Sequence, residues 1–543
     1  MMRCLFMVLI APTLALAACT KLANVQCEQS SNCNLSGGGV CTAAPTGNSW
    51  CAYPDPGCPS GYRYSTQATG DGVSGACVMD VPIDASVGPA VDAAVSDGPS
   101  PDGPVPFGAV AFTVGGNTPS GADVPNVIVS SGSDIIVSGA LNQAADLGGG
   151  ARMGDFVAKY NSSGTHLWSR SWNFDVTLRD VRVHPDGDVL LTGELAKGVD
   201  FGCGLITPSA NGDLIVVKLN GSNGTCRWST RATGSEHSQG DRIATVGSDV
   251  FVAGTFGSPN NSAGGGTLVL GSTSLVSAAA QDIFVARFQG ATGAPVWASS
   301  IPGTKNEYVT NIVAVGSDSF AIAGFLFGNG SSLTLGGSTF TKHLFAARFK
   351  ADGSGVIWAQ QYGNVDDEAT RALSLMTSGD LVLAADFTSS AAFGATTLQG
   401  TGLQSAAVAR LDAATGVPVW AKSFSAATRA TATRATVGGL TTLPGGNIVG
   451  ALQFTGTVTV GAQQLDSGSG QAIAVIQLAS DGQPISAKRY GGGNELDSVT
   501  AAGAVASGEV LLTGTFDHSI DFGASAPLSS MGSRTIFASR VSP

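Results

Sequence analysis

Short apolar runs bounded by turn residues recur along the second part of the chain. Each run holds four to six mostly apolar residues, begins on an acidic or amide residue, and often ends on glycine. An apolar run of this length is typical of a strand buried on both faces. There are seven copies: DIIVSG at 134, DVLLTG at 188, DVFVAG at 249, DSFAIAG at 318, DLVLAA at 380, NIVGAL at 447 and EVLLTG at 509.

A thirteen-residue stretch recurs between these runs. It reads VARFQGATGAPVW at 285–297 and VARLDAATGVPVW at 408–420, and AARFKADGSGVIW at 346–358 is a relative. The pattern predicts a strand, a tight turn and a second strand that ends on tryptophan. Successive tryptophans are 60–69 residues apart, and a basic residue lies nine or ten positions before each. The pairs are Lys159 with Trp168, Lys218 with Trp228, Arg287 with Trp297, Arg348 with Trp358, and Arg410 with Trp420.

Repeats of roughly 60 residues with about four strands each, and no helical period, predict an all-β fold, a seven-bladed β-propeller. In the sixth copy Gln477 and Ser486 replace the basic residue and the tryptophan, and Phe112 is expected at the tryptophan position of the opening copy. The region opens part-way into a repeat with VAFTVGG and closes with TIFASRV at 535–541. We therefore expect these N- and C-terminal strands to pair and close the ring, which removes exposed sheet edges.

Composition agrees with strands and turns. Charged residues make up only 12% of the 543 residues, and 75 are glycine. The chain has 39 acidic and 27 basic residues, a net charge of −12. Because proteins that bind nucleic acids carry basic stripes, this balance argues against a nucleic-acid partner.

The N-terminus has the pattern of an export signal. Arg3 precedes an apolar run from Leu5 to Leu16 that is too short to span a bilayer. The sequence Leu16-Ala17-Ala18-Cys19 resembles the lipobox of bacterial lipoproteins, which implies a signal peptide over 1–18 and lipidation of Cys19. Thr20 follows that cysteine, and by the same resemblance the absence of Asp there favours the outer membrane. The alternative is an ordinary secretory peptide cut after Ala18.

Eight further cysteines predict disulfides. After the short segment 19–26, six of them lie in a module over 27–78, where so short an exported segment needs cross-links to fold. Zinc is the alternative there, but the module has no CxxC pair and no histidine. A seventh and eighth, separated by 22 residues, are predicted to pair with each other. The eight are Cys27, Cys33, Cys41, Cys51, Cys58, Cys77, Cys203 and Cys226. A Pro- and Asp-rich linker over 79–107 then leads to the propeller over 108–543.

Residues 108–543 resemble the seven-bladed β-propeller repeat family of bacterial exported proteins. The likeness is carried best by YGNVDDEATRALSLMTSGDLVLAADF and YGGGNELDSVTAAGAVASGEVLLTGTF, in which a glycine and an acidic residue precede the apolar run. The sixth copy departs from the pattern because it lacks the acid. The resemblance implies the fold and no particular activity.

Acidic residues recur just after the tryptophan strand, and equivalent positions in a ring lie at one end of it. They predict a ligand rim that holds a cation or a hydroxyl-rich ligand. The alternative is that each carboxylate binds amides of its own loop. The candidates are Glu307, Asp366, Glu368, Glu495 and Asp497, and Glu236, Asp241 and Asp367 belong to the same recurrence. The tryptophans could stack on sugars, but packing between blades is the favoured interpretation.

No HExxH, GxSxG or Walker sequence occurs, so no catalytic residue, metal or cofactor is predicted. The expected function is a non-catalytic binding scaffold for a protein or a glycan, lipid-anchored at the outer membrane. The alternatives are an envelope enzyme acting on a polysaccharide and a purely structural assembly component.

Overall fold

The computed structural model describes residues 40–43, 49–55, 58, 62–65, 76–78, 110–114, 123–209, 212–258, 265–328, 330–364, 368–427, 433–523, 526–530 and 534–543. The chain divides into two units, Met1–Gly103 and Pro104–Pro543. Among the described residues, no helix is long and apolar enough to cross a membrane.

The first unit contains a small antiparallel sheet of β1 (Val40–Ala43), β2 (Ser49–Pro54) and β3 (Tyr62–Tyr64). A disulfide joins Cys58 to Cys77, and Cys41 and Cys51 are each disulfide-bonded as well. The predicted lipidation site Cys19, and Cys27 and Cys33, lie outside the described residues.

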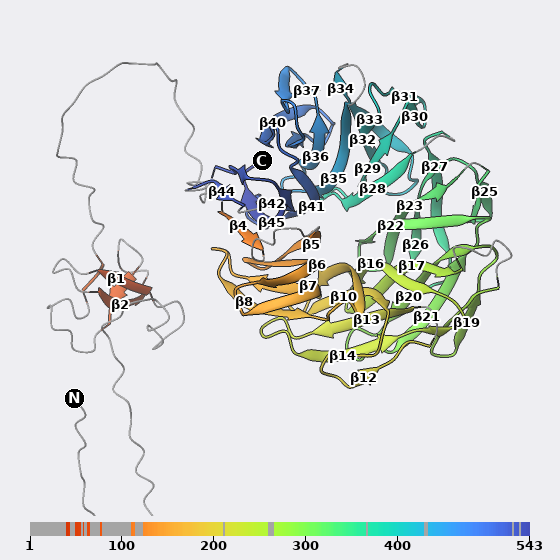
Figure 1. Cartoon of the computed structure of the whole chain (residues 1–543), viewed down its shortest axis with the longest axis horizontal. Helices are drawn as coiled ribbons and strands as arrows, with labels where there is room; N and C mark the ends of the chain where they lie inside the picture. The colour runs from red at the N-terminus through yellow and green to blue at the C-terminus, as the bar shows by residue number, and fades with distance from the viewer. Residues whose placement is uncertain are drawn as a thin grey trace, which may run out of the picture. The chain divides into compact units, whose positions relative to one another are not determined.

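The second unit is a ring of four-stranded antiparallel blades, numbered here in chain order (Figure 1). Blade 1 contains β5 (Val124–Ser131), β6 (Asp134–Asp146), β7 (Ala151–Tyr160) and β8 (His166–Ser171). Blade 2 contains β9 (Val176–Val183), β10 (Val189–Leu195), β13 (Asp213–Leu219) and β14 (Cys226–Arg231). Blade 3 contains β16 (Ser238–Val246), β17 (Asp249–Gly257), β20 (Gln281–Phe288) and β21 (Pro295–Ile301). Blade 4 contains β22 (Asn306–Val315), β23 (Ser319–Phe327), β26 (Leu344–Lys350) and β27 (Val356–Tyr362).

The remaining blades follow the same order from the innermost to the outermost strand. Blade 5 contains β28 (Ala369–Leu375), β29 (Leu381–Phe387), β32 (Ser405–Leu411) and β33 (Pro418–Phe424). Blade 6 contains β35 (Arg434–Thr442), β36 (Ile448–Thr455), β39 (Ala472–Leu478) and β40 (Pro484–Gly491). Blade 7 contains β41 (Ser498–Ala504), β42 (Val510–Phe516), β45 (Thr535–Val541) and β4 (Val110–Val114). The predicted all-β class and the seven four-stranded repeats are confirmed.

Blade 7 is assembled from both ends of the propeller region. β4 pairs antiparallel with β45, and the register sets Val110 opposite Arg540. In blade 5 the equivalent arginine, Arg410, is opposite Trp420. Val110 therefore occupies the tryptophan position, and the prediction of Phe112 was wrong by two residues. No turn connects these two strands, so the sequence offered nothing from which to count the offset.

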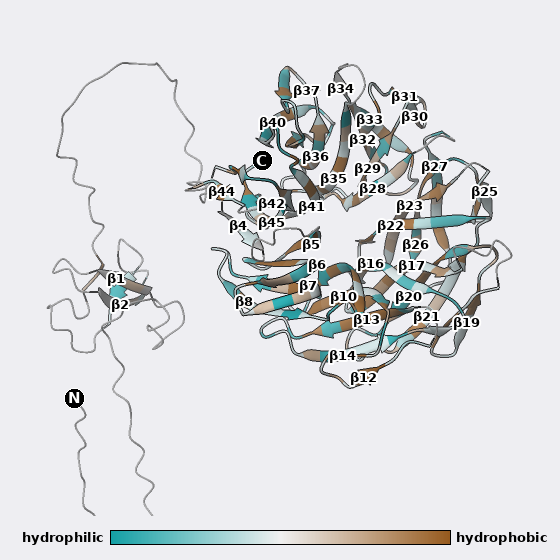
Figure 2. Ribbon diagram, viewed as in Figure 1, coloured by the Kyte–Doolittle hydropathy of each residue, from teal (hydrophilic) through white to brown (hydrophobic). Residues whose placement is uncertain are grey.

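The innermost strands contact one another in the order β5, β9, β16, β22, β28, β35 and β41, and β41 contacts β5. The hydrophobic core consists of layers between neighbouring blades, and apolar residues run along the blade strands in Figure 2. The layer between blades 7 and 1 is packed like the others, with Leu511 and Ile536 in the same cluster as Ile128 and Ile135.

The recurring tryptophan and basic residue together connect their blade to the next one. In five blades the indole N–H and the basic side chain donate to one carbonyl of the following blade, as Trp358 Nε1 (3.0 Å) and Arg348 (2.9 Å) do to Ala413 O. The carbonyls belong to Gly221, Gly290, Ala351, Ala413 and Ser480. A glycine of the same turn lies against the indole, and a Cβ on Gly293 would lie 2.4 Å from Trp228.

Blade 6 lacks this contact for a structural reason. The turn that receives the tryptophan connects the third and fourth strands of the following blade. In blade 7 those strands are β45 and β4, the two ends of the region, so that turn does not exist. Gln477 and Ser486 therefore face no connecting turn of blade 7. Asn447 replaces the acid that pairs with the basic residue in the other blades, except in blade 4, where Arg348 bonds Ser319 Oγ.

Between the second and third strands, most blades carry a small outer hairpin that the sequence did not predict. These are β11 (Val199–Asp200) with β12 (Leu205–Ile206), β18 (Thr267–Leu270) with β19 (Thr273–Val276), β24 (Leu333–Leu335) with β25 (Ser338–Phe340), β30 (Ser390–Phe393) with β31 (Thr396–Gln399), β37 (Thr457–Val460) with β38 (Gln463–Asp466), and β43 (Ser519–Ile520) with β44 (Leu528–Ser529). Two short strands, β15 (Thr233–Gly234) and β34 (Ala426–Ala427), extend the hairpins of blades 3 and 6.

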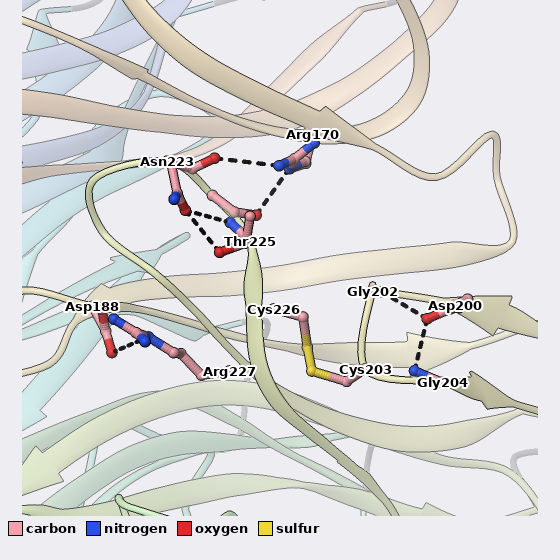
Figure 3. Close-up of a disulfide and its surroundings, with 11 residues drawn as sticks. Arg170, Asp188, Asp200, Gly202, Cys203, Gly204, Asn223, Thr225, Cys226 and Arg227 are labelled. Atoms are coloured by element: carbon pink, nitrogen blue, oxygen red, sulfur yellow. Dashed lines mark hydrogen bonds and ion pairs between the residues drawn. A yellow bond between two sulfur atoms is a disulfide. The ribbon is translucent and has the colours of Figure 1, made fainter.

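A hairpin glycine packs on the outer strand in several blades, as Gly394 does on Pro418. In blade 2 the hairpin glycine Gly202 lies in the same way against Cys226 at the start of β14, and a disulfide from Cys203 of the hairpin turn to Cys226 adds a covalent connection (Figure 3). The predicted pairing of these two cysteines is present. Asp200 holds the hairpin turn by accepting the N–H groups of Gly202 and Gly204.

Candidate functional site

The strand directions place two kinds of connection at the same end of the ring. Each blade is antiparallel, so the segments leading into the innermost strands and the outer hairpins lie at one end, which we name the hairpin end. The turns that receive the tryptophans lie at the other end. The predicted acidic rim belongs to the hairpin end.

Three of the predicted rim carboxylates are buried and bind amides of their own loops. Glu307 is fully buried and accepts the N–H groups of Thr304 and Lys305. Glu368 accepts the N–H of Asn364, and Asp497 accepts the N–H of Gly492. Each lies against a glycine of its loop, so a Cβ on Gly303, Gly363 or Gly491 would meet the carboxylate at about 2 Å.

Burial raises the pKa of two of these carboxyls, to about 7 for Glu307 and to about 6 for Asp497. Glu495 is half-buried, and Asp366 lies outside the described residues. The contacts of Glu307, Glu368 and Asp497 are those of the alternative weighed from the sequence, in which each acid holds its own loop.

A different set of side chains meets near the hairpin end. Every innermost strand contains a β-bulge, an extra residue without a partner on the second strand. The seven bulge residues are Asn126, Arg179, Asp241, Thr310, Arg371, Gly438 and Thr500. They form a belt at one level of the ring, in which charged side chains come only from blades 2, 3 and 5.

In five of the seven blades the recurring glycine at the end of the apolar run lies opposite the bulge. Gly193 faces the bulge of its own blade, and a Cβ there would lie 2.0 Å from the backbone oxygen of Thr177. Gly254 and Gly514 make the same close approach to Gln239 O and Ser498 O. Blades 5 and 6 bulge at the same position with Ala385 and Leu452 in place of the glycine, so the glycine accompanies the bulge in most blades but is not required for it.

Four side chains of blades 2 and 3, which we name the Asp241 cluster, form a connected group: Arg179, Gln239, Asp241 and Arg242. Arg179 donates to Gln239 Oε1 at 3.0 Å, and Gln239 Nε2 donates to Asp241 Oδ1 at 2.7 Å. Arg242 donates to the carbonyls of Asp241 and of Thr310 in the next blade. Arg179 is exposed although it belongs to an innermost strand, so its side chain reaches solvent on the ring axis.

Asp241 itself is 8% exposed, and its Oδ2 has no hydrogen-bond partner among the described residues. Burial raises the pKa of this carboxyl to about 6, and the charges of Arg242 and Arg179 oppose that rise. A buried carboxyl with a raised pKa beside exposed polar groups is a feature of binding and catalytic sites.

An aromatic cluster adjoins this group on blade 4. Tyr308 stacks on Phe325 with ring centroids 5.2 Å apart, and Phe327 meets Tyr308 edge-on at 6.2 Å. Phe327 is 59% exposed at the hairpin end of β23. The charge of Asp241 contributes to raising the pKa of Tyr308, after burial, which places the two clusters within electrostatic range. None of the three aromatic residues belongs to the repeat, so no periodic signal marked them.

Phe174 is a further exposed aromatic residue at the hairpin end, in the segment that leads into β9. It is 42% exposed and has a φ of 62°. Positive φ is costly for a bulky side chain and occurs most often at functional positions.

The opposite end of the ring has an open groove between blades 2 and 3 that includes His184, Asp186, Lys218 and Arg287. Lys218 pairs with Asp186 at 2.5 Å and bonds His184 Nδ1 at 3.2 Å. The same lysine holds the Gly290 carbonyl together with Trp228. These groups serve the contact between blades, and among the described residues no cluster of three or more His, Cys, Asp or Glu suits a metal ion.

Solved structures that resemble the chain are β-propellers. The structure of BamB from Moraxella catarrhalis matches with 13% identity and a TM-score of 0.35, over 79% of this chain and 99% of that one. The Dos1 propeller matches with 10% identity and a TM-score of 0.38, over 79% and 95%. The polysaccharide lyase Uly1 matches with 10% identity and a TM-score of 0.37, over 77% and 89%.

Likeness at this level carries no information on function. No protein-family model matches the chain, and no curated protein sequence matches it. Function therefore has to be argued from the two clusters at the hairpin end.

Proposed function

We propose that this protein is a lipid-anchored β-propeller of the bacterial cell envelope that acts as a binding scaffold, and that its ligand is a glycan held at the Asp241 cluster and the aromatic cluster. The observation that carries the proposal is the exposed aromatic cluster beside hydrogen-bonding side chains that are already fixed. Sugar rings stack on aromatic faces, and their hydroxyls need donors and acceptors whose geometry is set before binding.

The polar groups meet this requirement through their connections. Asp241 orients the Gln239 amide, and that amide holds Arg179. Little side-chain entropy is then lost when a ligand binds, which favours affinity.

The test is binding of the purified chain to a glycan array, repeated with Tyr308→Ala and Phe327→Ala. We expect both variants to lose most of the affinity for whichever glycan binds. Val276→Ala is the matched control, because Val276 is 60% exposed on an outer hairpin of blade 3. Equal binding by all three variants would rule out the aromatic cluster as the site.

The lipid anchor has its own test. The sequence around Cys19 supports it, and Cys19→Ser should move the protein from the membrane fraction to the soluble fraction. If the variant stays with the membrane, lipidation at Cys19 is not what holds it there.

One observation favours a second candidate, an enzyme that acts on a polysaccharide. The carboxyl of Asp241 has a pKa of about 6, which suits proton transfer near neutral pH. Asp241→Asn would then abolish turnover of the bound glycan and leave its binding intact. If wild type releases no product from a glycan that it binds, the scaffold function stands.

A further inference from the structure

The Asp241 cluster has more positive than negative charge, although the chain as a whole is at −12. It contains two guanidinium groups, of Arg179 and Arg242, and a single carboxyl. That carboxyl is buried and is easier to protonate than an ordinary aspartate. The site is thus positive at neutral pH, which an uncharged sugar does not require.

Two other arginines of the innermost strands are neutralised within the protein. Arg182 pairs with Asp180 at 2.7 Å, and Arg371 pairs with Asp386 at 2.5 Å. In the described part of the chain, Arg179 and Arg242 have no carboxylate within 4.0 Å. These two guanidinium groups therefore have charge to offer a ligand, as does the exposed Arg434 at the start of β35 in blade 6. Of the three, only Arg179 and Arg242 belong to the hydrogen-bonded group beside the aromatic cluster.

Their hydrogen bonds also leave donors free. A guanidinium has five N–H donors, and Arg179 uses one of them, toward the neutral Gln239. Arg242 is held by two backbone carbonyls, which fix its plane without cancelling its charge. A planar group held in this way suits bidentate bonds to carboxylate or sulfate oxygens.

We infer that the ligand is an anionic glycan, whose carboxylate or sulfate groups are bound by Arg179 and Arg242 while its sugar rings lie on Tyr308 and Phe327. This inference rests on the proposed function and adds the charge of the ligand. Position supports it, because Arg242 Nε bonds Thr310 O, two residues along β22 from Tyr308, and the charge of Asp241 acts on the Tyr308 hydroxyl.

The test uses the full chain and isothermal titration with three oligosaccharides of matched length: a polygalacturonate for carboxylates, a dextran sulfate for sulfates, and an uncharged dextran. We expect at least one charged probe to bind ~10-fold or more tightly than dextran, because hydrogen bonds to charged groups are the stronger kind. The stronger of the two charged probes identifies the anionic group.

Three variants make the charge argument specific. Arg179→Gln should weaken binding of the charged probe ~10-fold or more, and Asp241→Asn should strengthen it, because the variant removes the one carboxyl of the cluster. Arg227→Gln is the control, because Arg227 is 53% exposed on an outer strand and pairs with Asp188 at 3.4 Å (Figure 3). Unchanged thermal unfolding of each variant shows that it is folded.

Two outcomes would overturn the inference in different ways. If dextran binds as tightly as the charged probes and Arg179→Gln has no effect, the ligand is not anionic, but the glycan-binding function survives. If none of the probes binds and the glycan array is also blank, the proposed function fails together with the inference.

Discussion

At the scale of single residues, the recurring tryptophan and basic residue are explained by one backbone carbonyl of the next blade, which accepts hydrogen bonds from both side chains. In five blades an indole N–H shares a backbone oxygen with a basic side chain, as at Ala413 O, and the indoles of Trp168, Trp228 and Trp358 are buried. A buried indole N–H needs such a partner, and the bond itself contributes about 1 kcal/mol. Glu307 likewise holds its own loop by accepting a backbone N–H group. Its carboxylate lies against Gly303, where any larger residue would clash with it.

Burial of Glu307 predicts how stability depends on pH. The pKa of this carboxyl rises from 4.5 to about 7 in the folded protein, so the folded state keeps a proton that the unfolded chain has released. The free energy of unfolding should therefore fall as pH rises from about 4.5 to about 7, by roughly 3 kcal/mol from this group. Glu307→Gln keeps one acceptor oxygen for its loop and should flatten the decline, as measured by urea unfolding at pH 5 and pH 8.

Glu495→Gln is the control for that measurement, because Glu495 is half-buried in the corresponding segment before blade 7. A pH profile that Glu307→Gln leaves as steep as wild type would contradict the assignment of the decline to Glu307.

At the scale of elements, glycine residues lie where two backbone segments approach each other closely. In blades 2 and 3 the glycine that ends the apolar run faces the bulge of the innermost strand, and the bulge residues there are Arg179 and Asp241. In blade 2 a disulfide joins the outer hairpin to the outer strand in addition to the contact of a hairpin glycine with that strand.

Gly193→Ala tests the role of the bulge glycine. The added Cβ would lie 2.0 Å from Thr177 O, and backbone atoms of a central strand cannot move aside cheaply. We expect a loss of about 2 kcal/mol or more in the free energy of unfolding, whereas Gly445→Ala, which meets nothing within 4 Å, should change it little. Equal stability of the two variants would refute the packing argument.

The disulfide of blade 2 gives a prediction of its own. Cys203 and Cys226 are 23 residues apart, and closing a loop of this length stabilises a fold by roughly 3 kcal/mol in the chain-entropy model. Cys203→Ser with Cys226→Ser should lower the unfolding midpoint in denaturant, and a reducing agent should affect the double variant less than wild type. No difference in midpoint would mean that the hairpin is held by its other contacts.

At the scale of the whole molecule, the ring is closed by β4 on β45, and this closure explains the irregular sixth repeat. Ser486→Trp restores the motif residue in blade 6, but no turn of blade 7 is there to receive an indole. We expect no gain in stability, and a small loss from the exposed apolar surface, in thermal unfolding. A clear gain would show that some other group of blade 7 accepts the indole.

The repeat explains how far the sequence could predict this molecule. Strand number, blade number and the pairing of the two ends followed from period and phase, because a buried strand imposes its pattern on every copy. The position of Val110 did not follow, since only a connecting turn would have fixed its offset from Arg540. Asp241 was noticed as an acid, but its neighbour Arg179 comes from a bulge in another blade, about 60 residues earlier, and nothing local relates the two.

Blade 6 lacks the hydrogen bonds from a tryptophan and a basic residue to a carbonyl of the next blade, and this absence has a consequence for engineering of the chain. The degenerate copy lies next to blade 7, the blade that β4 and β45 complete from distant parts of the sequence. Consider a circular permutant in which β45 is joined to β4 by a turn and the chain is opened at the turn between β20 and β21. In this permutant blade 3, instead of blade 7, would be completed by the two ends of the propeller region. Trp228 and Lys218 of blade 2 would then lack the carbonyl that they bind. In blade 6, a basic residue at position 477 and a tryptophan at position 486 would become favourable.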